Sequence, residues 1–137
     1  MADMVEFELV SPERLVKSLP VEMVVVPCSE GDIGVLAGHT PLIGTVRPGV
    51  VDIHADNKVS ESIFVSGGFV EVTAERCTLL AEEAVSVGDL NAADAQSRLE
   101  AATTALEKAT TDSEKHNLVA EIKVAEGMLE ALGTSAH

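Results

Sequence analysis

The first part of the chain alternates apolar and polar residues. Val5, Phe7 and Leu9 alternate with Glu6 and Glu8, a period of two that turns one face of an extended chain to a core and the other to water. Similar short runs, rich in Val and separated by Pro, Gly or Asp-Asn, occupy residues 14–19, 21–26, 34–37, 49–55, 62–65, 69–73, 78–81 and 84–87. Many short strands with such punctuation predict an antiparallel β-sandwich or barrel.

Two turns of this sheet can be placed from their residues. Asp56-Asn57-Lys58 joins two alternating runs, and we expect a hairpin turn there because Asp and Asn tolerate positive φ. Gly67-Gly68 marks a second place where we expect the backbone to take positive φ or to form a bulge.

After Gly88 the chain changes to strong helix formers. Ala, Leu, Glu, Gln and Lys dominate there, and Pro is absent. Apolar residues repeat at spacings of four and three in two stretches, which are Ala95, Leu99, Ala102, Leu106 and Ala109 in the first and Leu118, Ile122, Ala125, Leu129 and Leu132 in the second. Each stretch predicts a helix with one narrow apolar stripe.

The ends of these helices carry capping signals. Thr111 is followed three residues later by Glu114, which predicts a capping box for the second helix, and Asp89 or Asn91 can cap the first. The link over 110–113 is short and predicts an antiparallel two-helix hairpin. Because each apolar stripe is narrow, we expect the hairpin to depend on docking, either to the sandwich or to a partner.

Composition and charge narrow the class of protein. The 137 residues suffice for one substantial core, and 46% hydrophobic residues are too many for a disordered chain. Only three residues are aromatic, all Phe, and 9 basic against 23 acidic side chains give a formal net charge of −14. Such a chain repels phosphate backbones and anionic lipids, so we expect no nucleic-acid partner.

The sequence predicts no membrane insertion. The longest apolar run, residues 23–28, is interrupted by Pro27, whereas a spanning helix needs about 20 residues. The beginning, Met1-Ala2-Asp3-Met4-Val5-Glu6, is acidic and alternating, unlike a secretion signal or a transit peptide. We therefore expect the mature protein to begin here, in the cytoplasm or in an organelle that makes it internally.

Residues 29–43 are the densest feature of the sequence. Their three glycines are spaced three and four apart, but the stretch contains no Lys and lacks the GxxxxGK[ST] order, so it does not predict a phosphate cradle. We expect the glycines to provide turns and Pro41 to end strand pairing. Glu30, Asp32 and His39 then become polar groups on a shaped, exposed loop.

Catalytic chemistry has little support. Asp32 and His39 could form a dyad, but Ser66-Gly67-Gly68 lacks the G-x-S-x-G order of a nucleophile elbow. We therefore expect a protein that is not an enzyme.

Cysteine and histidine spacing predicts no cofactor. Cys28 and Cys77 lie in strand-like runs with no CxxC pattern, which favours buried reduced thiols over the alternatives of a disulfide or a metal pair. No two of the four histidines have ligand spacing, and these are His39, His54, His116 and His137.

Several fragments in order give this sequence a family resemblance. They are Phe7-Glu8-Leu9-Val10-Ser11-Pro12-Glu13, Glu30-Gly31-Asp32-Ile33-Gly34-Val35-Leu36, Gly38-His39-Thr40-Pro41-Leu42, Arg47-Pro48-Gly49 and Ser66-Gly67-Gly68-Phe69-Val70-Glu71-Val72. Together they resemble the epsilon subunit of F-type ATP synthases over nearly the whole chain. Ala37 departs from the family, which often has Pro there.

The resemblance implies an α+β fold and a rotor role. It implies a β-sandwich of about ten strands over 1–88, seated on the gamma subunit and the c-subunit ring, and a mobile regulatory hairpin over 89–137. Such a subunit makes and breaks no bonds and helps to couple proton flow to ATP synthesis. The missing transit peptide and Gly38 before His39 favour the cytoplasmic face of a bacterial inner membrane.

The resemblance also assigns interface residues. It places Glu30, Asp32 and His39 on a loop that faces the c-ring, where carboxylates can pair with basic or amide groups and fix the register. The residues that it turns toward gamma are Ser11, Leu79, Leu80 and Ala81.

Two activities of relatives fit this chain poorly. Some bind ATP through the motif Ile or Leu, Asp, two variable residues, Arg, Ala, where this chain has Leu90, Asn91, Asp94 and Ala95 at the fixed positions. Because Asp94 reverses the charge of the Arg and would repel phosphate, we expect weak or absent ATP binding.

Other relatives inhibit ATP hydrolysis when basic side chains of the hairpin meet an acidic segment of the catalytic beta subunit. From Asp89 onward this chain has four basic and nine acidic residues, a net charge of −5. We therefore expect weak inhibition, since surface ion pairs contribute only about 0 to 1 kcal/mol each.

Two other classes of function stay open at this point. One is a stand-alone β-sandwich that binds a ligand or acts as an adaptor, and the other is a small hydrolase. The first needs a pocket with convergent polar groups and the second a nucleophile with a base. Co-purification separates them, because a rotor subunit should bring gamma with it.

Overall fold

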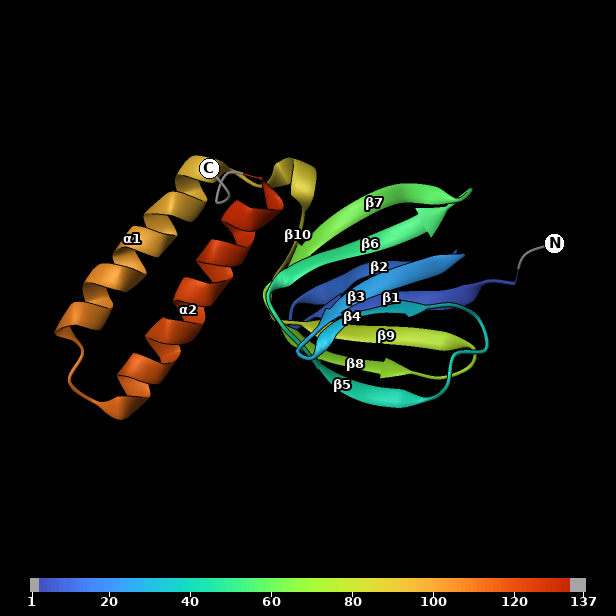
Figure 1. Cartoon of the computed structure of the whole chain (residues 1–137), viewed down its shortest axis with the longest axis horizontal. Coiled ribbons are helices and arrows are strands. Elements are labelled where there is room, and N and C mark those ends of the chain that lie inside the picture. The colour runs from blue at the N-terminus through green and yellow to red at the C-terminus, as the bar shows by residue number, and fades with distance from the viewer. Residues whose placement is uncertain (1–2, 134–137) are drawn as a thin grey trace. The chain divides into compact units, whose positions relative to one another are not determined.

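The computed structural model describes residues 3–133, so His137 lies outside the described part of the chain. The chain divides into two compact units between Ser86 and Val87, two residues before the change of composition at Gly88. The first unit consists of strands and the second of helices, so the predicted α+β fold class is confirmed (Figure 1).

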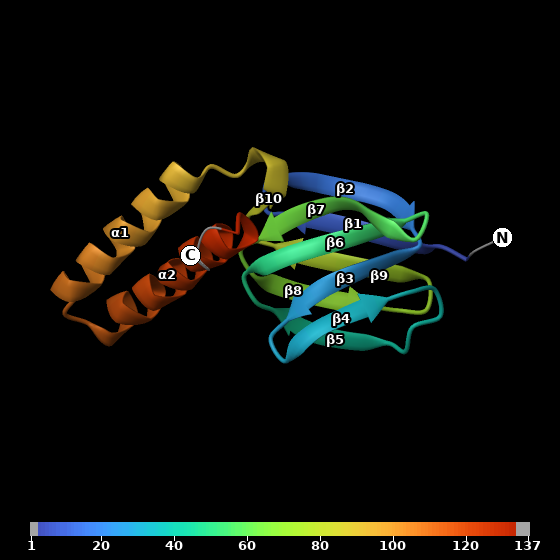
Figure 2. The ribbon, with the colours of Figure 1, turned by 45° about the horizontal axis from the view of Figure 1, so that its top comes forward.

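Ten strands build the described part of the first unit. They are β1 (Val5–Ser11), β2 (Arg14–Val21), β3 (Met23–Cys28), β4 (Gly31–Val35), β5 (Leu42–Val46), β6 (Gly49–Ala55), β7 (Lys58–Val65), β8 (Gly68–Val72), β9 (Arg76–Ala81) and β10 (Ala84–Ser86). Their order is β10-β7-β6-β3-β5-β8-β9-β1-β2, with β4 on β3 (Figure 2).

The sheet curls back on itself toward a barrel. An ion pair of 2.9 Å joins Lys17 Nζ on β2, at one end of the strand order, to Glu61 Oε2 on β7, near the other end. All neighbouring strands are antiparallel except β1 and β9, which run parallel. Curling leaves fewer exposed edges than an open sheet of this size would have.

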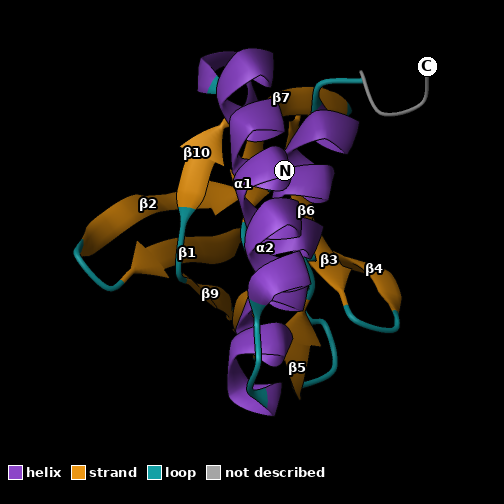
Figure 3. Ribbon diagram, turned by 90° about the vertical axis from the view of Figure 1, so that its left-hand side faces the viewer, coloured by secondary structure: helices purple, strands orange, loops and turns teal. Residues whose placement is uncertain are grey.

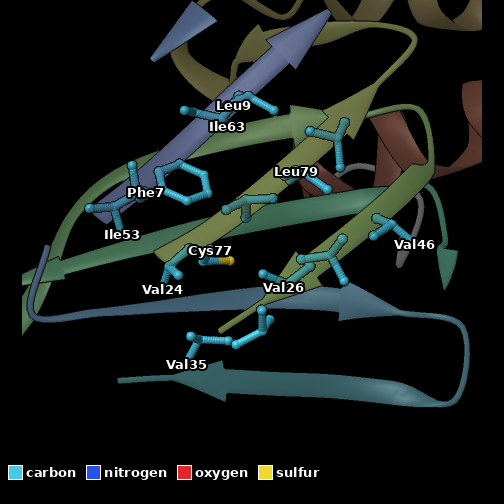
Figure 4. Packing of buried hydrophobic residues seen from close by; sticks show 14 of the residues in the cluster. Phe7, Leu9, Val24, Val26, Val35, Val46, Ile53, Ile63, Cys77 and Leu79 are labelled. Carbon is cyan, nitrogen blue, oxygen red and sulfur yellow. The ribbon is translucent and has the colours of Figure 1, made fainter. Parts of the chain in front are cut away.

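Alternation along the strands produces the core. Val5, Phe7 and Leu9 of β1 are fully buried, as their spacing predicts, and the inward residues of the other strands join them (Figure 4). Within residues 3–133 no polar or charged side chain is classed as buried. The core is therefore stabilised by apolar packing rather than by polar networks.

Both predicted turns are confirmed. Asp56 and Asn57 have φ of 55° and 65° and connect β6 to β7, and Gly67 and Gly68 have φ of 117° and 148°. Gly68 also lies against β9, where an added Cβ would come 1.8 Å from the backbone oxygen of Leu80. Only glycine fits there, on conformational and on steric grounds.

The strand predicted over 34–37 lies at residues 31–35 instead, and the expectation of one exposed loop that carries Glu30, Asp32 and His39 is wrong. Residues Gly31–Val35 form β4 against β3, and Leu42–Val46 form β5 against β8, leaving only 36–41 between them. Gly34 lies within β4 and Gly44 within β5. These glycines interrupt the alternation of apolar and polar residues, so the sequence does not show either strand clearly.

Two helices follow a short 3-10 turn (Val87–Asp89) in the second unit, α1 (Ala92–Lys108) and α2 (Asp112–Ala131) (Figure 3). Asn91 rather than Asp89 caps α1, since its Oδ1 accepts a hydrogen bond of 3.0 Å from the Asp94 amide. Thr111 caps α2 by accepting from the Glu114 amide at 3.1 Å, as predicted.

The apolar stripes are only partly buried. Ala95, Ala102, Ala125 and Leu129 are buried as predicted, and Val124 and Met128 are buried outside the predicted stripe. The other predicted members are half-buried, namely Leu99, Leu106, Ala109, Leu118, Ile122 and Leu132. No helix within residues 3–133 combines the length and the apolar character that a membrane span requires.

Candidate docking surfaces

The turn between β3 and β4 presents acidic groups at one end of the sandwich. Cys28 pairs with Gly31, so Ser29 and Glu30 form the turn, and both are exposed. Gly31 has φ of 137°, which favours glycine at this tight reversal. We call residues 29–32 the β3–β4 tip.

Arg47 links this tip to the body of the sandwich. Its Nη2 donates to Asp32 Oδ1 at 2.6 Å, its Nη1 donates to the Cys28 carbonyl oxygen, and its amide donates to the Pro27 carbonyl oxygen at 2.9 Å. The Ser29 amide and hydroxyl both donate to the Thr45 carbonyl oxygen on β5, at 2.8 and 3.2 Å. Arg47 therefore compensates the charge of Asp32, whereas Glu30 points its charge to solvent.

A pocket of about 480 Å³ lies between the tip and β5, lined by residues 28–33 and 42–45. Cys28 lies at its wall, and burial raises the pKa of its thiol, with Arg47 lowering it and Asp32 raising it by charge. Burial, with a smaller contribution from Cys28, raises the pKa of Cys77 to about 12. Both cysteines are unpaired and buried, as predicted, and neither is activated as a nucleophile.

His39 lies away from this tip. It belongs to residues 36–41 after β4, and a five-residue strand such as β4 spans roughly 15 Å. Its Nδ1–H donates to the Thr40 carbonyl oxygen at 2.7 Å, and the ring is half-buried. The expectation that Glu30, Asp32 and His39 share one loop is wrong, and an Asp32–His39 dyad is ruled out by the strand between them.

The outer face of β2, β1, β9 and β8 carries an apolar row. Cross-strand partners share a face, and Val10 pairs with both Leu15 and Leu80, while Leu80 pairs with Phe69. Phe69, Leu15 and Leu80 are 60%, 56% and 51% exposed. We call these four residues the apolar row, and such a contiguous exposed patch is typical of a protein interface.

Only part of the predicted gamma-facing set lies at the surface. Leu79 and Ala81 are 0% and 3% exposed and point into the core, so of the three β9 residues only Leu80 faces outward. Ser11 is half-buried and its hydroxyl donates to the Arg14 carbonyl oxygen at 3.3 Å. The expectation that Leu79 and Ala81 contact a partner through their side chains is wrong, because successive strand residues face opposite sides.

A sequence signal for the apolar row was available. Two adjacent apolar residues in a strand cannot both face the core, and Phe69-Val70 and Leu79-Leu80 are such pairs. The burial of Val70 and Leu79 leaves Phe69 and Leu80 outside.

The start of α1 contains the positions of the altered ATP motif. Asn91 uses its side-chain oxygen as the cap, Ala95 is buried, and Leu90 is half-buried. Asp94 is exposed in the first turn. A carboxylate in that turn interacts favourably with the positive end of the helix dipole, which would otherwise attract a phosphate group.

Within the described residues no group of three His, Cys, Asp or Glu side chains is placed to hold a metal ion. His54 lies on β6 and His116 on α2.

The family model for the ATP synthase delta/epsilon chain β-sandwich domain matches residues 4–87. The chain is 54% identical to an ATP synthase epsilon chain of Paramagnetospirillum magneticum over 132 residues, covering 96% of this chain and 99% of the relative. It is 50% identical to the ATP synthase epsilon chain of Rhodospirillum rubrum over 131 residues, 96% of this chain and 98% of that one.

Two solved structures share the fold. One comes from a structure of the OSCP, F1 and c-ring of the Euglena gracilis mitochondrial ATP synthase. The match has a TM-score of 0.78 at 23% identity and covers 94% of this chain and 81% of that chain. A chain of the Tetrahymena thermophila mitochondrial ATP synthase central stalk and c-ring gives a TM-score of 0.68 at 14% identity, covering 93% and 95%.

Proposed function

This chain belongs to the ATP synthase epsilon-chain family, and from that premise we propose that it is a non-catalytic rotor subunit linking gamma to the c-ring. In that role it couples proton flow to ATP synthesis at the cytoplasmic face of a bacterial inner membrane, as a peripheral protein. The observation that carries the proposal is the apolar row, an exposed surface that a partner subunit would cover.

Gamma is the partner proposed for the apolar row. Leu80 lies within the row, between Val10 and Phe69, and large side chains near the centre of an interface contribute most of the binding energy. Ser11 follows Val10 at the end of β1 and is proposed to lie at the edge of the same interface.

Binding to gamma tests this assignment. Leu80→Glu should weaken association with purified gamma by roughly tenfold or more, because the interface would bury an unpaired carboxylate. Val59→Glu, at an exposed apolar position of β7 outside the apolar row, is the matched control and should stay within about threefold. Equal affinities for the wild type and Leu80→Glu, measured by surface plasmon resonance, would refute gamma as the partner of this row.

The β3–β4 tip is proposed to face the c-ring. Asp32 is already paired with Arg47, so the exposed carboxylate of Glu30 is the group available for basic or amide groups of c-subunit loops. Such contacts set register and association rate more than affinity. His39, at the other end of β4, would require a separate contact with the ring.

Proton pumping tests the tip. Glu30→Lys should reduce ATP-driven proton pumping of the reassembled complex, and Glu75→Lys, an exposed acid in the turn before β9, is the control. Pumping by Glu30→Lys at the level of the control would contradict the assignment.

The hairpin is proposed to be a weak regulator of ATP hydrolysis. Arg98, one of its four basic residues, already donates to Glu121 Oε1 from Nε at 2.9 Å and from Nη2 at 2.6 Å. This leaves less positive charge for an acidic segment of the beta subunit. ATP hydrolysis should therefore change by less than roughly twofold when the chain ends at Gly88, because surface ion pairs are weak, and a several-fold activation would overturn the proposal.

Weak or absent ATP binding is the last part of the proposed function. Calorimetry should detect no binding at millimolar ATP, and Asp94→Arg should strengthen it by replacing the repelling carboxylate with a phosphate-binding group. Millimolar or tighter binding that Asp94→Arg does not alter would show that the altered motif is irrelevant.

A further inference from the structure

The β3–β4 tip lacks strand pairing on its outer side. Ser29 and Glu30 fall between β3 and β4, and the only ladder contact of β3 with β5 is the pair Cys28–Val46. A hairpin end of this kind is held by few backbone bonds and can open locally without global unfolding. Other groups must therefore hold the tip against β5.

Arg47 supplies those groups from a position just after β5. Its guanidinium donates to the carbonyl oxygen of Cys28 before the turn and to the carboxylate of Asp32 after it, so one planar group spans both arms of the hairpin. The same residue is fixed by its own amide, which donates to the Pro27 carbonyl oxygen. A planar fork with two donors in fixed geometry suits this bridge better than a lysine ammonium.

From this arrangement we infer that Arg47 is a positioning residue, which holds the β3–β4 tip so that the Glu30 carboxylate is presented in one place to a partner subunit. The inference rests on the proposed docking of this tip to the c-ring. The ion pair is exposed on both sides, and exposed pairs stabilise a fold little. Its main effect is therefore on the placement of the tip rather than on global stability.

Hydrogen exchange of the isolated protein tests the placement directly. The Ser29 amide donates to the Thr45 carbonyl oxygen, so its exchange rate reports whether the tip is packed against β5. Arg47→Ala should raise this rate by roughly tenfold or more, because the hydrogen bonds from the charged Arg47 guanidinium to the tip are lost. The core amides should keep their rates. Arg76→Ala is the matched control, because Nη1 of Arg76 on β9 makes a surface ion pair of 2.9 Å with Glu8 on β1, away from the tip. Unchanged exchange at Ser29 in Arg47→Ala would overturn the inference.

A double-mutant cycle against purified c-ring in detergent separates positioning from mere stability. If Arg47 acts through Glu30, Arg47→Ala alone should weaken binding to the c-ring. When Glu30→Gln is already present, adding Arg47→Ala should weaken this binding little further. Arg47→Lys should recover only part of the loss, since one ammonium cannot bridge both arms. Additive effects of the two changes would overturn the positioning role.

The two proposals fail in different ways. If Glu30→Gln binds the c-ring as the wild type does, the docking of the tip is refuted and the role of Arg47 toward it falls as well. If Glu30→Gln weakens binding and Arg47→Ala does not, docking stands and the positioning role is refuted.

Discussion

The two units of this chain reach stability by different physical means. In the sandwich, large side chains such as Phe7, Leu9 and Ile63 are almost completely buried. In the hairpin, three of the six buried residues of the helices are alanines, namely Ala95, Ala102 and Ala125, and most of the predicted stripe is half-buried. Because apolar burial contributes about 25 cal/mol per Å², the larger number of buried large side chains gives the sandwich more stabilisation than the hairpin.

From this difference we expect one chain to combine a stable platform with a hairpin of lower intrinsic stability. A platform that presents the apolar row and the β3–β4 tip must keep its strands in register. Besides its six buried residues, the hairpin is held by caps and by the Arg98–Glu121 ion pair. Contacts of this kind contribute less than about 2 kcal/mol each and can be exchanged for others.

A core truncation should give the largest contrast between the units. Phe7→Ala should destabilise the sandwich by about 3 to 5 kcal/mol, through lost apolar transfer and the cavity that remains. Leu106→Ala on α1 should cost only about 1 kcal/mol, because that side chain is half-buried. Hydrogen exchange resolved by residue assigns each loss of stability to the sandwich or to the hairpin. Equal losses in the two units would contradict the difference between them.

A backbone change should give the next largest effect. Gly68→Ala should destabilise the sandwich by about 3 kcal/mol, because φ is 148° and the new Cβ meets the Leu80 backbone oxygen. Gly34→Ala on β4 is the control, since its φ is not positive and an added Cβ would meet only the flexible end of Met23 at 3.4 Å. Chemical denaturation measures both, and a stable Gly68→Ala would mean that β8 and β9 can shift apart.

Loss of a helix cap should have a smaller effect, confined to the hairpin. Thr111→Ala removes the acceptor for the Glu114 amide and should cost about 1 kcal/mol. Thr104→Ala, at an exposed position within α1, should be neutral or slightly stabilising. Exchange rates of the first α2 amides provide the measurement, and faster exchange in the sandwich strands as well would show that the units are coupled.

The weakest effect is expected at the ion pair between the helices. Glu121→Gln should cost no more than about 1 kcal/mol, because both side chains of the pair with Arg98 are partly exposed. The loss should shrink further at high salt, which screens exposed charges. A loss well above this value in a denaturation series at several salt concentrations would make the pair a main support of the hairpin.

Much of the fold could be predicted from local sequence. Alternation gave β1 and most later strands, Asp56-Asn57 gave the hairpin turn, and Thr111 with Glu114 gave the cap of α2. These signals lie within a few residues of each other, so they need no knowledge of the whole structure.

The missed features depend on residues far apart in the sequence. β5 was missed because glycine and proline around Leu42 obscure its period, and it is held by pairing with β8. Arg47 pairs with Asp32, fifteen residues earlier, and neither residue type indicates that partner. Burial of Leu79 and Ala81 required knowing which face of β9 meets the core.

The parallel pairing of β1 with β9 joins the earliest strand of the chain to one of the last strands of the sandwich. During translation β1 cannot acquire this neighbour until residues 76–81 have left the ribosome. Contacts so distant in sequence slow folding, and β1 meanwhile has only β2 beside it. We therefore expect the emerging chain to need protection by a chaperone until β9 has been synthesised.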